Sequence, residues 1–456
     1  MSVTARPQAP AGAHAHAPRF VTGSIPRHIL VMTGTSAVGL IAIFVSDFAN
    51  IFFLGLAGDL GLLAAVGYGS SLLFLLYSGG VGMAVAVTAL VAPALGARDV
   101  DRAKRLATHA LVFAAGATSL TVAALWPALP TLLGWLGARG RTLPLAHDFV
   151  RIVLPSIVPL TLGMCLSAVL RSAGDPRRAM YITLSGAVIA TLLDAVLIVW
   201  LGLGIHGAAI SAFISHFAIL GVGWWAAVHV HGLLVRPRWR IFEYDAAVIA
   251  RFAAPSVLTN LATPAGGAYV TMAIAQFGDS AVAGWAVIAR VIPIAFGAIF
   301  ALSGSIGAIV GQNYGAREFA RVRATLNGGL AFALGVSALA WLALAIIAPG
   351  LVRLFNAAGE AAELIMFFCR WLAPLFAFFG TLFVCNAACN TLGRPQYATL
   401  LSWGRATLGT VPFVTLGAHW GAKGALFGHM MGGIAFGLAA VLVVRSLIAR
   451  LERERA

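Results

Sequence analysis

Long apolar segments recur along the whole chain and constrain its fold more than any other feature. A helix needs about 20 apolar residues to cross a bilayer. About twelve segments meet this requirement, near 29–56, 61–93, 104–133, 146–172, 179–202, 207–232, 247–277, 282–311, 322–350, 362–390, 396–418 and 422–446. Hydrophobic residues make up 60% of the chain and charged residues only 10%, whereas about a quarter of a soluble domain is charged. The runs are continuous and do not alternate, which excludes a closed β-barrel. The sequence therefore predicts an all-α integral membrane protein.

Basic residues concentrate in the connections at one end of these segments. If the N-terminus is cytoplasmic, the outer connections hold only Arg139, Arg141, Arg353 and Lys423. The inner connections hold many more, including Arg98, Arg102, Lys104, Arg105, Arg236, Arg238, Arg240, Arg317, Arg321 and Arg323. Cytoplasmic loops carry an excess of Lys and Arg, so we expect a multi-pass protein of the cell (inner) membrane with both termini in the cytoplasm. The basic clusters are dispersed between apolar runs, so the net charge of +15 does not indicate a nucleic-acid partner.

The sequence contains an internal repeat. "LGARDVDRAKRLA" at 95–107 resembles "YGAREFARVRATL" at 314–326, and "SAGDPRRA" at 172–179 lines up with "TLGRPQYA" at 391–398. Gly96 aligns with Gly315 and Gly174 with Gly393, both at an offset of 219. Two copies of a six-helix unit share one orientation, because six is even, and an axis along the membrane normal relates them. Such parallel repeats are typical of transporters whose two lobes rock about a central site to give alternating access.

The repeat and the charged stretches predict the domain boundaries. Residues 1–25, rich in Pro, Ala and His, are expected to form a disordered cytoplasmic tail. The N-lobe (26–232) and the C-lobe (247–446) follow, joined by a charged cytoplasmic linker at 233–246, and residues 447–456 form a second tail. We expect the protein to work as a monomer in the lipid bilayer.

Two acids lie well inside apolar segments, Asp47 and Asp194, while the other acids fall in loops, tails or segment ends. An acid at mid-helix costs roughly 2.5–3.5 kcal/mol on insertion scales, which implies a partner, water or a bound ion. The repeat carries Asp194 to Phe413 and Asp47 to Gly266 or Gly267. A requirement of the scaffold should recur in both copies, so the asymmetry favours a functional role for both acids.

Polar neighbours accompany both acids. Asn50 follows Asp47 by one turn, and Thr191 precedes Asp194 by one turn. Carboxylates with hydroxyl and amide neighbours can bind Na⁺ through oxygen. They can equally hold a proton, because burial and like charge disfavour the ionised form. We therefore predict a cation-coupling site at Asp47, Asp194, Asn50 and Thr191. The coupling ion is H⁺ or Na⁺, and no other metal site is expected.

Several motifs resemble one known family. "VAPALGARDVDRAKR" at 91–105 and "IVGQNYGAREFARVRA" at 309–324 resemble the paired motif of multidrug and toxic compound extrusion (MATE) transporters. "LRSAGDPRRAMYITLSGAVIATLLDAVLIVWLGLGIHGAAISAFIS" at 170–215 resembles the block from the fourth loop to the sixth helix of that family. The resemblance covers about 25–446 and implies a two-lobe efflux fold, in which Na⁺ or H⁺ enters as an organic, often cationic, compound leaves.

The resemblance also assigns residues, with some departures. Asp194 occupies the position of the family's fifth-helix acid, whereas the position of the first-helix acid is occupied by Asn50, with Asp47 one turn earlier. Ala190 replaces the Asn that usually precedes the fifth-helix acid. Thr35 lies near the position of a common first-helix Pro, and Thr263 near that of a seventh-helix acid found in some members.

Other residues are candidates for a substrate cavity. Tyr68, Tyr77, Trp285 and Arg290 lie inside apolar segments and could contact an organic substrate. His216 and His429 are expected to be packed, hydrogen-bonded histidines.

Alternative functions remain open from sequence. No phosphate-binding loop, metal cluster or nucleophile triad is visible, so we expect neither an enzyme nor a cofactor. The main prediction is an antiporter that exports organic, cationic or amphiphilic compounds. The alternatives are a flippase for a lipid-linked precursor on a related fold, a major facilitator-type transporter, which also has two six-helix halves, and a channel or structural membrane protein.

Overall fold

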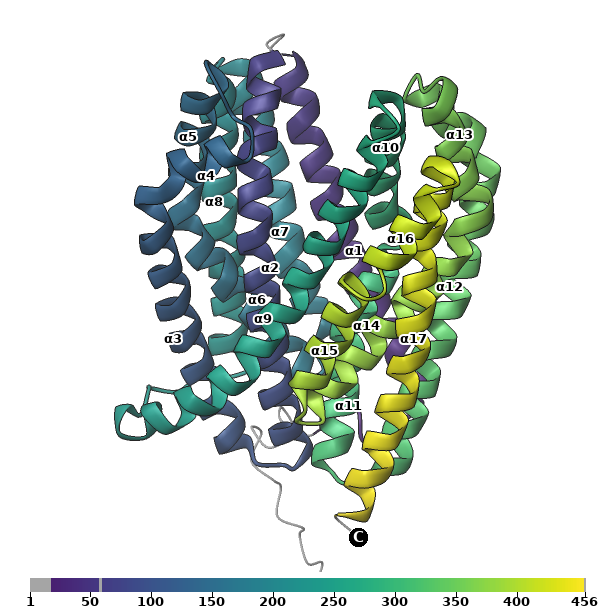
Figure 1. Cartoon of the computed structure of the whole chain (residues 1–456). Helices are drawn as coiled ribbons and strands as arrows, with labels where there is room; N and C mark the ends of the chain where they lie inside the picture. The colour runs from purple at the N-terminus through teal and green to yellow at the C-terminus, as the bar shows by residue number, and fades with distance from the viewer. Residues whose placement is uncertain (1–17, 57–59, 455–456) are drawn as a thin grey trace, which may run out of the picture.

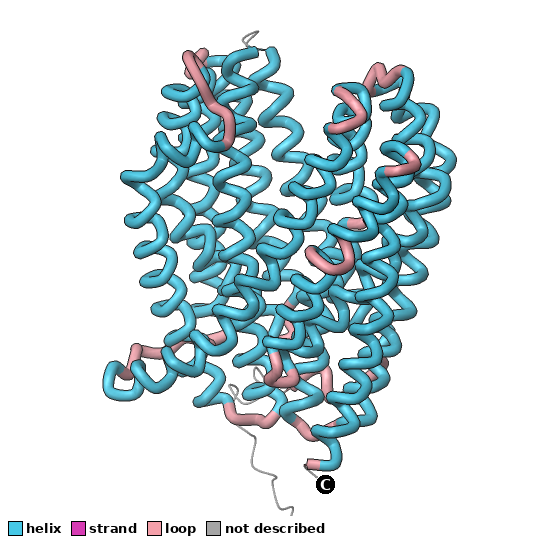
Figure 2. Tube along the Cα trace, in the orientation of Figure 1, coloured by secondary structure: helices cyan, strands magenta, loops and turns pink. Residues whose placement is uncertain are grey.

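The structure is a computed structural model that describes residues 18–56 and 60–454. Every regular element in these two ranges is helical and they contain no strand (Figure 2). Lipid offers no hydrogen-bond partners to the backbone, so helices, which satisfy their own amide and carbonyl groups, are the structures that long apolar segments form. The prediction of an all-α membrane protein is confirmed.

The described part of the N-lobe contains eight α-helices. They are α1 (Ile25–Leu56), α2 (Leu60–Gly96), α3 (Val100–Leu125), α4 (Leu129–Trp135), α5 (Thr142–Val153), α6 (Ile157–Ser172), α7 (Pro176–Asp194) and α8 (Gly204–Trp225). Short 3₁₀ or π segments extend several of them, so that α3 with α4, and α5 with α6, each form one long span.

The C-lobe repeats this order. Its helices are α9 (Trp239–Ala275), α10 (Asp279–Ala295), α11 (Gly297–Gly315), α12 (Phe319–Leu354), α13 (Gly359–Phe367), α14 (Phe376–Thr391), α15 (Pro395–Ala406), α16 (Val411–Ala418) and α17 (Gly421–Arg453). Helix α9 begins within the predicted linker 233–246, so part of that stretch is already helical.

The described residues contain 10 helices long and apolar enough to cross a membrane, or up to 11 when α10 and α11 count as one span bent by 48°. The remaining predicted segment, 396–418, is divided into α15 and α16, and neither half is long enough to span alone. The two-lobe prediction is thus confirmed, but one of the twelve predicted helices is broken.

The two lobes lie side by side and meet toward one end (Figure 1). In the view of Figure 1, the ribbons converge at the lower end, where the C-terminus lies, and diverge toward the upper end. Helix α2 of the N-lobe packs against α9 and α11 of the C-lobe, and α1 packs against α11.

Two glycines of the repeat bring α2 and α11 into close contact. A Cβ atom added to Gly96 would collide with the backbone of Gln312, and one added to Gly315 would collide with the backbone of Pro93. Pro93 and Gln312 are themselves equivalent positions in the two copies. The crossing is therefore symmetric, and we place it on the approximate two-fold axis between the lobes.

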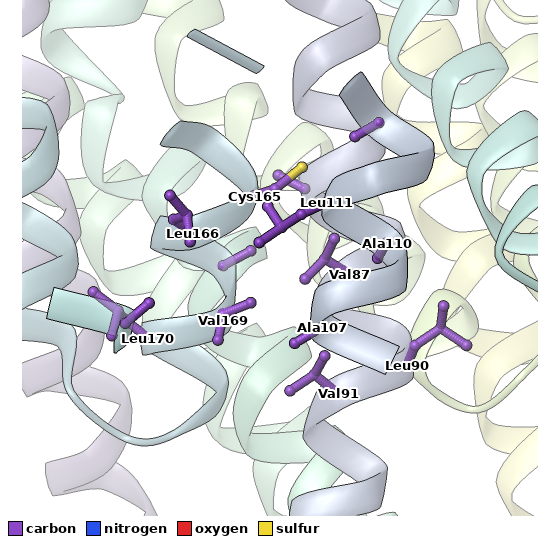
Figure 3. Close-up of a cluster of buried hydrophobic side chains, with 14 of the residues drawn as sticks. Val87, Leu90, Val91, Ala107, Ala110, Leu111, Cys165, Leu166, Val169 and Leu170 are labelled. Atoms are coloured by element: carbon purple, nitrogen blue, oxygen red, sulfur yellow. The ribbon is translucent and has the colours of Figure 1, made fainter. Parts of the chain in front are cut away.

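The interior of the N-lobe is built from small and branched side chains. Figure 3 shows Val87 of α2, Ala107 and Ala110 of α3, and Cys165 and Val169 of α6 in one buried cluster. Small residues allow the backbones of membrane helices to approach closely and gain van der Waals contact. The free thiol of Cys165 acts here as a small apolar group.

The segment before α1 is packed onto the bundle. Phe20 is buried, and its backbone carbonyl accepts hydrogen bonds from Asn313 at the end of α11 and Arg321 in the first turn of α12. The predicted disordered tail 1–25 therefore extends too far toward α1, since the structure describes an ordered segment from residue 18. Residues 1–17 of that prediction, and 455–456 of the second tail, lie outside the described residues.

Candidate functional site

Asp194 lies where α7 changes from an α-helix to a π-helix, which continues over Ala195–Trp200. π-Bulges inside helices are frequent at functional sites. The side chain is 2% exposed, and its Oδ2 accepts a hydrogen bond from Nδ2 of Asn50 at 2.9 Å. Its Oδ1 is buried without a hydrogen-bond partner among the described residues. One oxygen of this carboxylate is therefore satisfied and the other is not.

A second polar layer joins α1 and α7 one turn away. Oγ1 of Thr191 lies 3.0 Å from Oγ of Ser46 and 2.9 Å from the carbonyl of Ala187. Ser46 also donates to the Ala187 carbonyl at 3.2 Å. Thr191 thus helps to fix the register of α1 against α7, which holds Asn50 level with Asp194.

Asp47 occupies a different environment from Asp194. Its side chain is exposed on the protein surface and makes no hydrogen bond within the described ranges. Its charge interacts with Asp194 and with Tyr77 of α2. Of the four residues proposed for cation coupling, Asn50 contacts Asp194 directly and Asp47 acts on it only electrostatically. Asn50, which makes the contact with Asp194, occupies the position where the family resemblance places the first-helix acid.

Neither acid has a basic partner in the described chain. Asp47 and Asp194 form no ion pair, whereas the other two buried acids, Asp175 and Asp245, pair with Arg178 and Arg105 respectively, and Asp47 is exposed. The Ser211 hydroxyl lies near Asp194 but donates to the carbonyl of Ala190 at 2.9 Å. An unpaired buried carboxylate is costly, so Asp194, with the charge of Asp47 nearby, favours binding of a cation.

The tyrosines proposed for the substrate cavity belong to the N-lobe. Tyr77 is half-buried, and its ring meets that of His216 edge to face, with centroids 6.0 Å apart. Nδ1 of His216 is hydrogen-bonded to Oγ of Ser156 at 2.7 Å, which confirms the prediction of a packed, hydrogen-bonded histidine. Tyr68 packs against the outer core of this lobe.

The other two cavity candidates belong to the C-lobe. Trp285 is 8% exposed and its indole donates to Oγ1 of Thr271 at 2.9 Å, so it is largely a core residue. Arg290 is exposed and makes no hydrogen bond or ion pair in the part of the chain that the structure describes. The structure therefore distributes the four candidates over two lobes.

Two polar residues were missed by the sequence analysis. Gln312 connects three parts of the chain: its Nε2 donates to the Ser172 carbonyl at 2.7 Å, and its Oε1 accepts from the amide of Phe20 at 2.9 Å. Arg405, in the last turn of α15, is buried in the C-lobe. The signal for both was present, since each is a polar residue within an apolar segment.

A comparison with known families decides the class of protein. The family model described as MatE matches residues 36–196 and 255–415. This chain belongs to the MATE family of transporters. The two matched ranges are displaced by 219 residues at both ends (36 to 255, and 196 to 415), the offset of the internal repeat.

Relatives of known name cover most of the chain. A protein named FAD transporter from Shewanella oneidensis is 27% identical over 92% of this chain and 94% of its own length. The multidrug export protein MepA of Staphylococcus aureus is 20% identical over 91% of this chain and 92% of its own. A crystal structure of a mutant of the Vibrio cholerae MATE transporter VcmN shares the fold, with a TM-score of 0.88 and 24% identity over 93% of this chain and 97% of that one.

The MATE assignment favours one of the functional hypotheses. Members of the family are multi-pass membrane transporters and not enzymes, and they carry small molecules. The main hypothesis is thereby favoured over a flippase, a major facilitator-type transporter and a channel. Within the described residues, no group of three or more His, Cys, Asp or Glu side chains could hold a metal ion.

Proposed function

We propose that this protein is a secondary active antiporter that exports organic compounds in exchange for a cation, which binds in the N-lobe. The observation that carries this proposal is the buried Asp194 carboxylate, which among the described residues has one unpartnered oxygen and no basic partner. Asn50 supports its other oxygen, and Asp47 adds negative charge nearby. A cation that enters this site neutralises charge that the fold leaves uncompensated.

The geometry favours H⁺ over Na⁺ as the coupling ion. A proton needs one oxygen, and Oδ1 of Asp194 provides one without any rearrangement. A hard metal cation needs several oxygen ligands at once. Asp47, the second candidate ligand, makes no direct contact with Asp194, so Na⁺ would require α1 to rotate or shift.

The contacts between the lobes support alternating access. Gln312 and the Gly96–Gly315 crossing hold the lobes together at the end of the bundle that carries the described N-terminal segment and the end of α17. With both termini in the cytoplasm of the cell, as the basic loops indicate, the lobes are closed toward the cytoplasm and diverge toward the outside. Export requires these contacts to open and close in each cycle.

The names of the relatives suggest the range of cargo. One is named a multidrug export protein and another FAD transporter, and both names point to organic compounds, of which FAD carries aromatic rings and phosphate groups. We propose such a compound as the cargo, transported by a monomer in the inner membrane.

Transport by purified protein tests the proposal. Proteoliposomes are loaded with ethidium in one set and with FAD in another, and a pH gradient or a Na⁺ gradient is imposed separately on each. We expect the pH gradient alone to drive movement of at least one probe, and the Na⁺ gradient to have no effect. Movement driven by Na⁺ alone would refute the choice of H⁺. Movement that neither gradient accelerates would refute antiport.

A further inference from the structure

Arg405 is a buried cation in the middle of the predicted apolar segment 396–418. It lies in the last turn of α15, just before the break between α15 and α16, and only 3% of the residue is exposed. A cation inside a membrane protein is rare and usually pairs with an acid or with backbone carbonyls. The placement of Arg405 therefore requires a partner.

No such partner is present among the described residues. The Arg405 guanidinium makes no hydrogen bond or ion pair there, and its Nε is completely buried. The acids of the C-lobe are Asp279, Glu318, Glu360 and Glu363, and none of them pairs with Arg405. Arginine carries five N–H donors in a fixed planar arrangement, and all of them lack an acceptor here.

The neighbours of Arg405 form a polar and aromatic group in the interior of the C-lobe. The guanidinium lies over the ring of Phe379 of α14, 5.1 Å from its centroid. The same ring packs against His429 of α17 at 5.4 Å, and Nδ1 of His429 is also buried without a hydrogen-bond partner. His429 is packed as predicted but lacks the predicted hydrogen bond at this nitrogen. A cation–π contact stabilises charge but leaves the N–H donors unsatisfied.

The repeat argues against a purely structural role for this arginine. The equivalent position in the N-lobe, at the offset of 219, is Gly186 of α7, which packs against Ile219. A cation required by the scaffold should occur in both lobes. Arg405 is therefore a feature of the C-lobe alone, as the two acids are features of the N-lobe alone.

We propose that Arg405, with His429 beside it, binds an anionic phosphate or carboxylate group of the exported compound. Planar guanidinium groups bind such oxygens through two parallel hydrogen bonds. That the bound anion belongs to the exported compound rests on the export function proposed above. The C-lobe then binds the anionic end of the cargo, while the N-lobe binds the coupling cation.

Equilibrium binding to the complete protein, without any gradient, tests this site. The protein is placed in phosphatidylcholine nanodiscs, and the probes are riboflavin and its 5′-phosphate ester, which differ only in one phosphate group. We expect the unmodified protein to bind the phosphate ester at least about tenfold more tightly, the range for a charge-assisted hydrogen bond. Equal binding of the two flavins, or binding of neither, would overturn the proposal whatever the behaviour of the variants.

Three variants and one lipid condition complete the design. Arg405→Gln should abolish the preference for the phosphate ester and leave riboflavin binding unchanged, while Arg405→Lys should retain most of the preference. Arg370→Gln removes an exposed arginine of the same lobe and should have no effect. A persistent preference in Arg405→Gln, or an equal loss in Arg370→Gln, would contradict the assignment. If phosphatidylglycerol in the discs abolishes binding of the ester, the anion at Arg405 is a lipid headgroup and the cargo assignment fails.

The two proposals can fail separately. An Arg405-dependent flavin preference without gradient-driven transport would keep the anion site and refute antiport. Gradient-driven transport without the preference would keep antiport and refute the anion site.

Discussion

Helix α7 of the N-lobe and the α15–α16 pair of the C-lobe are copies of one element with different paths. Helix α7 continues through Asp194 into the π segment that ends at Trp200. The C-lobe copy stops at Ala406, turns over Thr407–Thr410, and resumes as α16. Proline explains the difference: Pro412, in the first turn of α16, is equivalent to Leu193. A proline in a helix interior lacks an N–H and clashes with the carbonyl four residues earlier, so an unbroken helix is disfavoured here.

The same pair of elements differs in charge. The N-lobe copy carries Asp194 where the C-lobe has Phe413, and the C-lobe copy carries Arg405 where the N-lobe has Gly186. Both charges are buried and lack an ionic partner among the described residues. The duplicated element therefore recurs in both lobes, but each copy has its own path and carries its own buried charge.

The largest effect is expected from removal of the N-lobe charge. Asp194→Asn should reduce pH-driven transport in proteoliposomes to the level of empty vesicles, because the amide cannot take up and release a proton. Asp47→Asn should reduce it less, since Asp47 is exposed and contributes only charge. Asp148→Asn, at an exposed acid of the same lobe, serves as the control. Undiminished transport by Asp194→Asn would show that the coupling cation does not bind at this acid of the N-lobe.

A smaller loss is expected when the hydrogen bond to this acid is removed. Asn50→Ala deletes the donor to Asp194 but keeps the carboxylate. A hydrogen bond to a charged group contributes about 1.5–3 kcal/mol, so we expect transport to slow by about tenfold or more. Thr191→Val removes only the neighbouring contact between α1 and α7 and should have a weaker effect. If the order of these two variants is reversed, Thr191 and not Asn50 is the main support of the site.

The third prediction concerns the crossing of α2 and α11, which is a contact that the two lobes share by symmetry. Gly96→Leu and Gly315→Leu should separate the two helices to similar extents, because each glycine touches the backbone of the other helix. Spin labels at Arg98→Cys and Arg317→Cys, both exposed, should report a longer distance, and the four native cysteines are buried. Gly335→Leu is a matched control, since no atom lies within 4 Å of the added Cβ. Unequal effects of the two leucines would mean that the crossing is not symmetric.

The smallest expected effect concerns the loops before α7 and α15. Asp175 caps α7, whereas its equivalent in the C-lobe, Arg394, makes no capping hydrogen bond. Burial alone would raise the pKa of Asp175, but hydrogen bonds from His231 and Arg178 outweigh it and hold the pKa below its ordinary value. A carboxyl group with a depressed pKa in the folded state stabilises the protein above its unfolded pKa of about 3.9. This contribution is lost as the pH falls through the folded pKa.

Thermal unfolding in detergent measures this difference between the loops. Asp175→Asn should lower the free energy of unfolding at neutral pH by about 1–3 kcal/mol. The difference in stability between the variant and the unmodified protein should become smaller in strong acid. Arg394→Gln should leave the pH profile unchanged. If the difference in stability between Asp175→Asn and the unmodified protein is the same at neutral and acid pH, the charge of Asp175 does not contribute to stability.

The sequence predicted the architecture because the bilayer imposes simple rules. Segment length and the lack of charge predict spanning helices, and a constant offset between glycine landmarks predicts two parallel lobes. Asp194 was found for the same reason, since an acid within an apolar run is expensive. The break between α15 and α16 was not predicted, although Pro412 was visible, because prolines inside α9 and α12 are accommodated without a break.

Contacts between distant segments depended on the tertiary structure. Which residue of α1 meets Asp194 depends on the rotation of one helix against another, and in the structure Asn50 makes the contact while Asp47 stays exposed. Arg405 could be seen in the sequence, but the lack of any acid beside it could not, because hydrogen-bond partners come from several helices. The sequence by itself thus determined the membrane class, the helical segments, the repeat and the identity of the buried acid. Only packing decided which polar groups are paired and which are left to bind a ligand.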